Sequence, residues 1–96
     1  MHGAIINAGA VIGNNCIINT LATIDHNTIV DDHSHISTGA ILNGGVIVGS
    51  GSFIGSGSAI KQDIKIGCRS VVGMGLVVRE NIPDGGCFLG PHKNDC

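Results

Sequence analysis

Residues 4–27 read AIINAG AVIGNN CIINTL ATIDHN, four hexads that share one pattern. The third position of each hexad is isoleucine, and the first position is a small residue. Neither the 3.6-residue period of a helix nor the two-residue alternation of a long strand produces a period of six. The pattern therefore predicts a repeat architecture. It continues to residue 78, with an aliphatic residue in all thirteen of the third positions: Ile6, Ile12, Ile18, Ile24, Val30, Ile36, Leu42, Val48, Ile54, Ile60, Ile66, Val72 and Val78.

Each hexad predicts a short strand followed by a corner. Residues two apart in a strand face the same side, so the first and third positions should fill one narrow interior. The sixth position is Gly, Asn, Asp or His in eleven of thirteen hexads, and these residues tolerate a positive φ. Three hexads would complete one triangular coil, and residues 18 apart would stack at roughly 4.8 Å. We therefore expect an all-β fold, a single-stranded parallel β-helix of about four triangular coils.

The hexad pattern fails after Val78. The next aliphatic position would be Asp84, and residues 82–86, IPDGG, are typical of turns. We therefore expect a β-helix domain over residues 1–81 and a C-terminal tail over residues 82–96, in which residues 87–96 form a terminal arm.

The composition excludes several classes of function. The chain has 96 residues, which allows one domain, and only 12% are charged, with a net charge of −2. Neither this charge nor the 2% aromatic content suits binding of nucleic acid. We expect free thiols, because the four cysteines match no zinc-ribbon spacing. The sequence shows no apolar leader or membrane-length apolar run, so we expect no membrane association and a cytoplasmic location.

The residue before each interior aliphatic should point outward. It is a large apolar residue in nine of thirteen hexads. Monomers seldom expose such stripes to water, so we expect an interface, and three similar faces favour a homotrimer. Outward Val and Ile could also be present only because they favour strands.

Few reactive groups remain once the repeat explains the Gly, Asn, Ile and Val residues. His26 should stand at an edge of the prism, where it is either a general base or a solvated turn histidine. His35 takes an outward position among apolar neighbours, as an interface or ligand contact. Gly44 lies 18 residues after His26, and its N–H could donate to an oxyanion beside the base, or the position could be merely a flexible corner. His33 occupies a corner position, which its tolerance of positive φ explains.

At these residues the chain resembles the bacterial hexapeptide-repeat acyltransferases, within them the sugar acetyltransferases that act on sialic acids or amino-sugar nucleotides. The resemblance covers nearly the whole chain. The repeat specifies only the superfamily, whereas the Asp-His element followed nine residues on by Ser-His-Ile-Ser is more specific. The matching segments are residues 17–20 (IINT), 24–26 (IDH), 34–40 (SHISTGA), 44–46 (GGV), 52–55 (SFIG) and 82–83 (IP).

The resemblance implies a left-handed β-helix, a homotrimer, and acetyl-CoA as co-substrate in a groove between subunits. It implies that His26 takes the proton from an amine or hydroxyl of a small acceptor, a sugar or sugar nucleotide, as that group attacks the thioester. It also implies that Gly44 polarises the acetyl carbonyl, and that His35, Ser56 and Met74 line the coenzyme groove.

The chain departs from the family pattern in two respects. Relatives often carry an acidic residue directly after the histidine, where this chain has Asn27, and Asp25 is the candidate to replace that charge. Many relatives also have an N-terminal α/β domain, so the identity of the acceptor and the choice between N- and O-acetylation stay open. Two alternatives remain: a non-catalytic trimeric assembly or binding module, and a zinc site of the carbonic-anhydrase kind on a similar β-helix.

Overall fold

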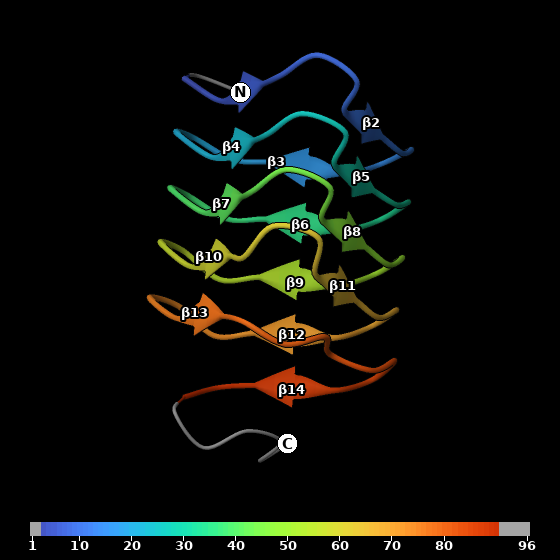
Figure 1. The fold of residues 1–96 in the computed structure, drawn as a ribbon, viewed down its shortest axis with the longest axis vertical. Helices are drawn as coiled ribbons and strands as arrows, with labels where there is room; N and C mark the ends of the chain where they lie inside the picture. The colour runs from blue at the N-terminus through green and yellow to red at the C-terminus, as the bar shows by residue number, and fades with distance from the viewer. Residues whose placement is uncertain (1–2, 91–96) are drawn as a thin grey trace.

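The computed structural model describes residues 3–90, and all of its regular secondary structure is β (Figure 1). Fourteen strands of two residues each follow one another, and the first thirteen occupy the second and third positions of the hexads. They are β1 (Ile5–Ile6), β2 (Val11–Ile12), β3 (Ile17–Ile18), β4 (Thr23–Ile24), β5 (Ile29–Val30), β6 (His35–Ile36), β7 (Ile41–Leu42), β8 (Ile47–Val48), β9 (Phe53–Ile54), β10 (Ala59–Ile60), β11 (Lys65–Ile66), β12 (Val71–Val72), β13 (Val77–Val78) and β14 (Cys87–Phe88).

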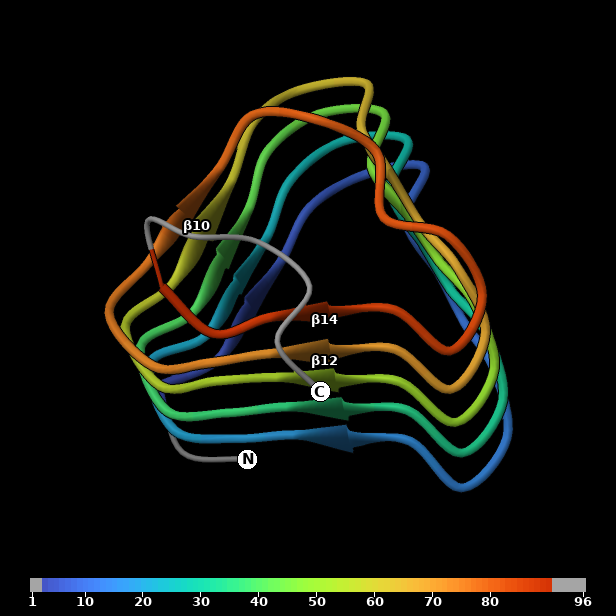
Figure 2. The same ribbon diagram turned by 90° about the horizontal axis from the view of Figure 1, so that it is seen from below.

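The strands stack into three parallel sheets that form the sides of a triangular prism (Figure 2). Sheet A contains β1, β4, β7, β10 and β13, sheet B contains β2, β5, β8 and β11, and sheet C contains β3, β6, β9, β12 and β14. Up to β13 each residue pairs with the residue 18 positions along the chain, as Ile5 does with Thr23. Seen from the C-terminal end, the chain turns clockwise as it approaches the viewer, which is the sense of a left-handed helix. The predicted left-handed parallel β-helix is confirmed, with five coils in place of about four.

The three edges of the prism are named here by the sheets that they join. The A–B edge holds residues 7–9, 25–27, 43–45, 61–63 and 79–81. The B–C edge holds residues 13–15, 31–33, 49–51, 67–69 and 83–85, and the C–A edge holds residues 19–21, 37–39, 55–57 and 73–75. Twelve of the thirteen predicted corner residues have a positive φ. They include Leu21 (φ 61°) and Arg69 (φ 52°), whose residue types do not favour it, because the stacked neighbours impose the turn.

The interior is filled as the hexad pattern predicts. The aliphatic side chains at the third hexad positions from Ile24 to Val78 are buried, whereas Ile6 in the first described coil is half exposed. Buried hydroxyls also occupy small interior positions and donate to backbone carbonyls 15 residues along the chain. Ser34 donates to Gly49 O at 2.9 Å, and Ser52 donates to Gly67 O at 2.6 Å. These bonds satisfy polar groups that would otherwise be buried without partners.

The last coil is two residues shorter than the others. Ile82 bridges to Ile66, and Cys87 and Phe88 of β14 pair with Val71 and Val72, 16 residues earlier. Ile82 is buried and takes the interior position that the hexad count assigns to Asp84. The prediction that the winding stops at residue 81 is therefore wrong: the helix continues at least to Phe88.

The cysteines differ from the expectation at one position. Cys16 and Cys68 are free, whereas Cys87 is disulfide-bonded, so the prediction of free thiols is wrong for Cys87. Cys96 and the rest of the predicted arm beyond residue 90 lie outside the described residues. Within residues 3–90, no helix has the length and apolar character that crossing a membrane requires.

Candidate active site

The A–B edge carries Asp25, His26 and Asn27 directly after β4. Asn27 adopts the left-handed conformation, with φ 57°, that turns the chain toward sheet B. Asp25 Oδ1 accepts a hydrogen bond of 2.7 Å from the His26 N–H, which fixes the start of the corner. The His26 side chain is 66% exposed, so the imidazole stands at the edge as predicted and is accessible from outside.

Asp25 orients the imidazole of His26. The same Oδ1 lies 2.9 Å from His26 Nδ1. Three hydrogen bonds lower the pKa of Asp25 below its ordinary value, so the carboxyl is ionised at neutral pH. The largest effect comes from the His26 backbone N–H, followed by the His26 side chain and the Asn7 side chain. An ionised carboxylate only accepts hydrogen bonds, so in the neutral imidazole Nδ1 carries the proton and Nε2 keeps its lone pair. Nε2 is therefore the atom that can take a proton.

Gly44, in the next coil, lies directly against this ring. A Cβ at Gly44 would stand 2.8 Å from His26 Cε1 and 2.9 Å from Nε2, closer than real contacts allow. Gly44 does not have a positive φ, so the ring and not the backbone conformation explains the glycine. Among residues 3–90, no hydrogen bond uses the Gly44 N–H, whereas the Gly45 N–H donates to His26 O at 3.1 Å. The site therefore combines an oriented imidazole with an uncommitted backbone donor.

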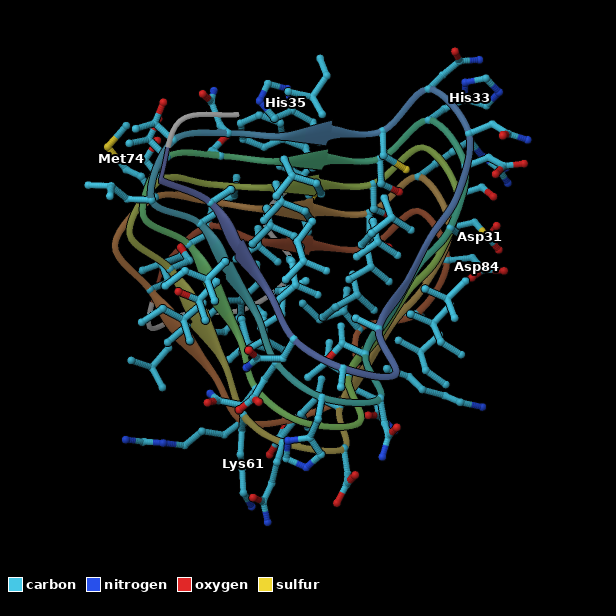
Figure 3. The ribbon with its side chains drawn as sticks, turned by 90° about the horizontal axis from the view of Figure 1, so that it is seen from above. Asp31, His33, His35, Lys61, Met74 and Asp84 are labelled. Carbon is cyan, nitrogen blue, oxygen red and sulfur yellow. The ribbon has the colours of Figure 1, made fainter. Side chains whose placement is uncertain are left out.

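The other predicted site residues lie elsewhere on the prism. His35 is on sheet C, paired in register with Ile17 and Phe53, and its ring meets Phe53 edge-on with centroids 5.1 Å apart. Its Nε2 is buried and has no hydrogen-bond partner among residues 3–90. Figure 3 shows sheet C, with His35, opposite the corner marked by Lys61, which is the A–B edge. The strand with His35 therefore lies across the prism from His26.

Ser56 and Met74 share the C–A edge. Ser56 is exposed, and the Met74 side chain is 76% exposed at the corner where Figure 3 labels it. One chain thus brings together Asp25, His26 and Gly44 but not His35, Ser56 and Met74.

A hollow of about 570 Å³ lies near the C-terminal end, lined by residues that include Val78, Arg79 and Phe88, and His26 does not line it.

His33, the remaining histidine within residues 3–90, takes the predicted corner position, and the three imidazoles in this part of the chain do not converge. His33 lies on the B–C edge with φ 61°. Among residues 3–90, no group of three His, Cys, Asp or Glu side chains could hold a metal ion. A zinc site of the carbonic-anhydrase kind would therefore need ligands that are not gathered within this part of the chain.

The sequence analysis missed Asn7. Its Nδ2 donates to Asp25 Oδ1 at 3.1 Å, from the coil that precedes His26. The two residues are 18 apart, so the period of one coil was the signal that could have identified this contact.

No model of a protein family and no curated protein matches the chain. Solved structures do match. The acetyltransferase domain of PglB from Neisseria gonorrhoeae is 37% identical, with a TM-score of 0.94 over 98% of this chain and 46% of that chain. A variant of perosamine N-acetyltransferase from Caulobacter crescentus, in complex with CoA and GDP-perosamine, is 35% identical, with a TM-score of 0.93 over 98% of this chain and 45% of that chain.

The PglB domain in complex with acetyl coenzyme A is 34% identical, with a TM-score of 0.80 over 96% of this chain and 51% of that chain. This chain therefore spans about half the length of the structures that it matches. The resemblance to sugar acetyltransferases that the motifs predict is confirmed over nearly the whole of residues 1–96.

Proposed function

Because the chain resembles acetyltransferase domains over nearly its whole length, we propose that it transfers the acetyl group of acetyl-CoA to an amine of a sugar nucleotide. The observation that carries the proposal is the His26 imidazole, which Asp25 orients against the backbone of Gly44. The neighbours with CoA or acetyl-CoA bound support the choice of co-substrate, and the neighbour with GDP-perosamine bound supports an amino-sugar nucleotide as acceptor.

In the proposed reaction, His26 Nε2 is the general base. The acceptor nitrogen attacks the acetyl carbon, a C–N bond forms, and Nε2 takes the proton that the nitrogen loses. The C–S bond then breaks, and the coenzyme leaves as the thiolate, which is protonated to the free thiol. The uncommitted Gly44 N–H donates to the oxyanion that forms in between. Direct attack within an oriented complex requires no acyl-enzyme intermediate.

Asp25 replaces the charge that Asn27 cannot supply. The Asp25 carboxylate stabilises the imidazolium that forms when Nε2 takes the proton, from 2.9 Å away at Nδ1. Asn27 instead places its Oδ1 close to Gly9, where a Cβ would be 2.5 Å from it. The acid before the histidine thus takes the role usually held by the acid after it.

The working enzyme is proposed to be a homotrimer. His26 lies on the A–B edge, whereas His35, Ser56 and Met74 lie on sheet C and the C–A edge, so one groove can contain all of them only if two copies contribute. Exposed apolar residues on sheets A and C, such as Ile41 and Phe53, supply the contact area. Within residues 3–90 the Nε2 of His35 is buried without a hydrogen-bond partner, so a coenzyme group in that groove would bond to it only after the ring turns outward. The expected cytoplasmic location is part of the same proposal.

The first experiment is a calorimetric titration of acetyl-CoA into the protein, with the oligomeric mass measured on the same sample. We expect one site per chain in a trimer. Turnover is then measured as thiol release with amino-sugar nucleotides, GDP-perosamine first. His26→Ala should lower kcat about 100-fold or more and leave acetyl-CoA affinity unchanged. An intact trimer that binds no acetyl-CoA would refute the enzyme and favour the assembly module, and metal analysis of that sample tests the zinc alternative.

A further inference from the structure

The Asp25 carboxylate receives a hydrogen bond from the coil before it. Its Oδ1 accepts three donors: the His26 N–H at 2.7 Å, His26 Nδ1 at 2.9 Å and Asn7 Nδ2 at 3.1 Å. The first two come from the residue that Asp25 orients, so they move with it. Asn7 is the donor that ties the carboxylate to a different coil.

The next corner along the chain provides an internal comparison. Asp31 also follows a strand directly, and its Oδ1 accepts the N–H of Asp32 at 2.8 Å. The residue 18 positions before Asp31 is Gly13, which has no side chain to donate. The side-chain bond from the preceding coil is therefore not a general requirement of these corners.

Asn7 also differs from the Asn at the same position of the third hexad, residues 16–21. Asn19 uses its Oδ1 to accept the N–H of Thr20 at 2.8 Å, a bond that stabilises its own turn. Within the described residues, the side chain of Asn7 makes no such bond to the next residue and is directed to Asp25 instead. A purely local turn role for Asn7 does not explain this geometry.

We propose that Asn7 is a positioning residue for the acetyl-transfer reaction: its Nδ2 holds Asp25 Oδ1 in the place from which that oxygen orients His26. The inference rests on the proposed function. Asp25 is partly exposed, with 34% of its side chain accessible, so without Asn7 its carboxylate can rotate toward water. Loss of this anchor would leave Nδ1 unpaired for part of the time and let the imidazole leave its place against Gly44.

The test compares Asn7→Ala with Asn14→Ala. Asn14 lies in the same first coil, and its side chain makes no hydrogen bond within residues 3–90, so Asn14→Ala controls for loosening of that coil. We expect Asn7→Ala to lower kcat about three- to tenfold, the range for one hydrogen bond of about 1 kcal/mol, with KM for acetyl-CoA unchanged. Asn14→Ala should change neither. Equal losses in the two variants, or no loss in Asn7→Ala, would overturn the proposal.

A double-mutant cycle separates positioning from a structural role. Asp25→Ala removes the oxygen that accepts the Asn7 hydrogen bond, so adding Asn7→Ala to Asp25→Ala should lower kcat no further. The same loss in both backgrounds would mean that Asn7 acts independently of Asp25, contrary to the proposal.

A readout without turnover keeps this inference distinct from the proposed function. Titration of the Asp25 carboxyl by NMR should show that its pKa rises toward the ordinary value in Asn7→Ala, because a donor to the ionised form is lost. Unchanged titration overturns the Asn7–Asp25 contact whether or not the protein acetylates anything. A wild-type protein that binds acetyl-CoA but transfers no acetyl group to any amino-sugar nucleotide refutes the reaction and with it the positioning role, even where the contact is confirmed.

Discussion

Gly44→Ala tests whether the imidazole of His26 needs the space over that backbone. The added Cβ would lie 2.8 Å from Cε1 and 2.9 Å from Nε2, whereas ordinary contacts begin at 3.4 Å. The ring must therefore move by roughly 0.6 Å or tilt away from Asp25. Since a displacement of about 1 Å can cost about 100-fold in rate, we expect kcat to fall by about 10- to 100-fold.

The substitution should leave the fold intact. Gly44 does not have a positive φ, so alanine fits its backbone conformation. A matched control is Gly90→Ala, because Gly90 has no positive φ and a Cβ there would meet nothing within 4 Å among residues 3–90. Both variants should keep the melting temperature of the wild type within a few degrees.

Two assays together decide the question. Steady-state thiol release gives kcat and KM, and NMR of the imidazole reports the position of the ring. We expect a lower kcat with a displaced His26 signal and an unchanged KM for acetyl-CoA. A raised KM with an unchanged kcat and an unmoved ring would refute the reasoning, because the glycine would then be needed for the approach of the ligand and not for the imidazole.

Three further substitutions test the electrostatics and the packing. Asp25→Asn should lower kcat at neutral pH, because the imidazolium that forms in the proposed reaction loses a negative charge 2.9 Å away. The wild-type advantage should disappear only as the pH falls through the lowered pKa of Asp25, where that charge is lost. An unchanged kcat would separate Asp25 from the base. Ser52→Ala should lower the free energy of unfolding by about 1–3 kcal/mol, since Ser52 donates to Gly67 O and accepts from the Ser70 N–H, and by more than Ser34→Ala, which loses one bond. Leu21→Asn should raise that free energy by about 1 kcal/mol in chemical denaturation, because Leu21 has φ 61° and is 63% exposed; a lower value would show that its side chain packs usefully.

The coils were predictable because the signal repeats thirteen times. A single period of six fixes which side chain is buried, which turns the chain and which residues stack, so the interior from Ile24 to Val78 follows from the sequence. The last coil was not predictable in the same way. The last coil is two residues shorter, so its interior position is Ile82 and not Asp84. The period of six assigns Asp84 to the interior and therefore predicts that the strand pattern ends at this turn.

The sequence identified candidate residues for the site but only part of how they lie relative to one another. The 18-residue period was enough to place Gly44 against His26. The period does not say what fills the space between the two residues. The structure shows that the His26 ring lies where a Cβ of residue 44 would come too close to it. His35 was placed correctly on an outward face, yet its unpartnered Nε2 follows from packing against Phe53, which no pattern of residue types contains.

The sequence around His26 does not show by itself which of its two neighbours orients the imidazole. Asp25 and Asn27 flank His26 equally in the sequence, so the sequence alone gives either residue the same access to the ring. At the end of β4 the carboxylate folds back to accept the His26 N–H, and the oxygen that makes this turn also reaches Nδ1. Asn27 must adopt positive φ to turn the corner, and its Oδ1 lies close to Gly9. The turn thus gives the orienting role to the residue before the histidine, so the proposed reaction does not require an acid after it.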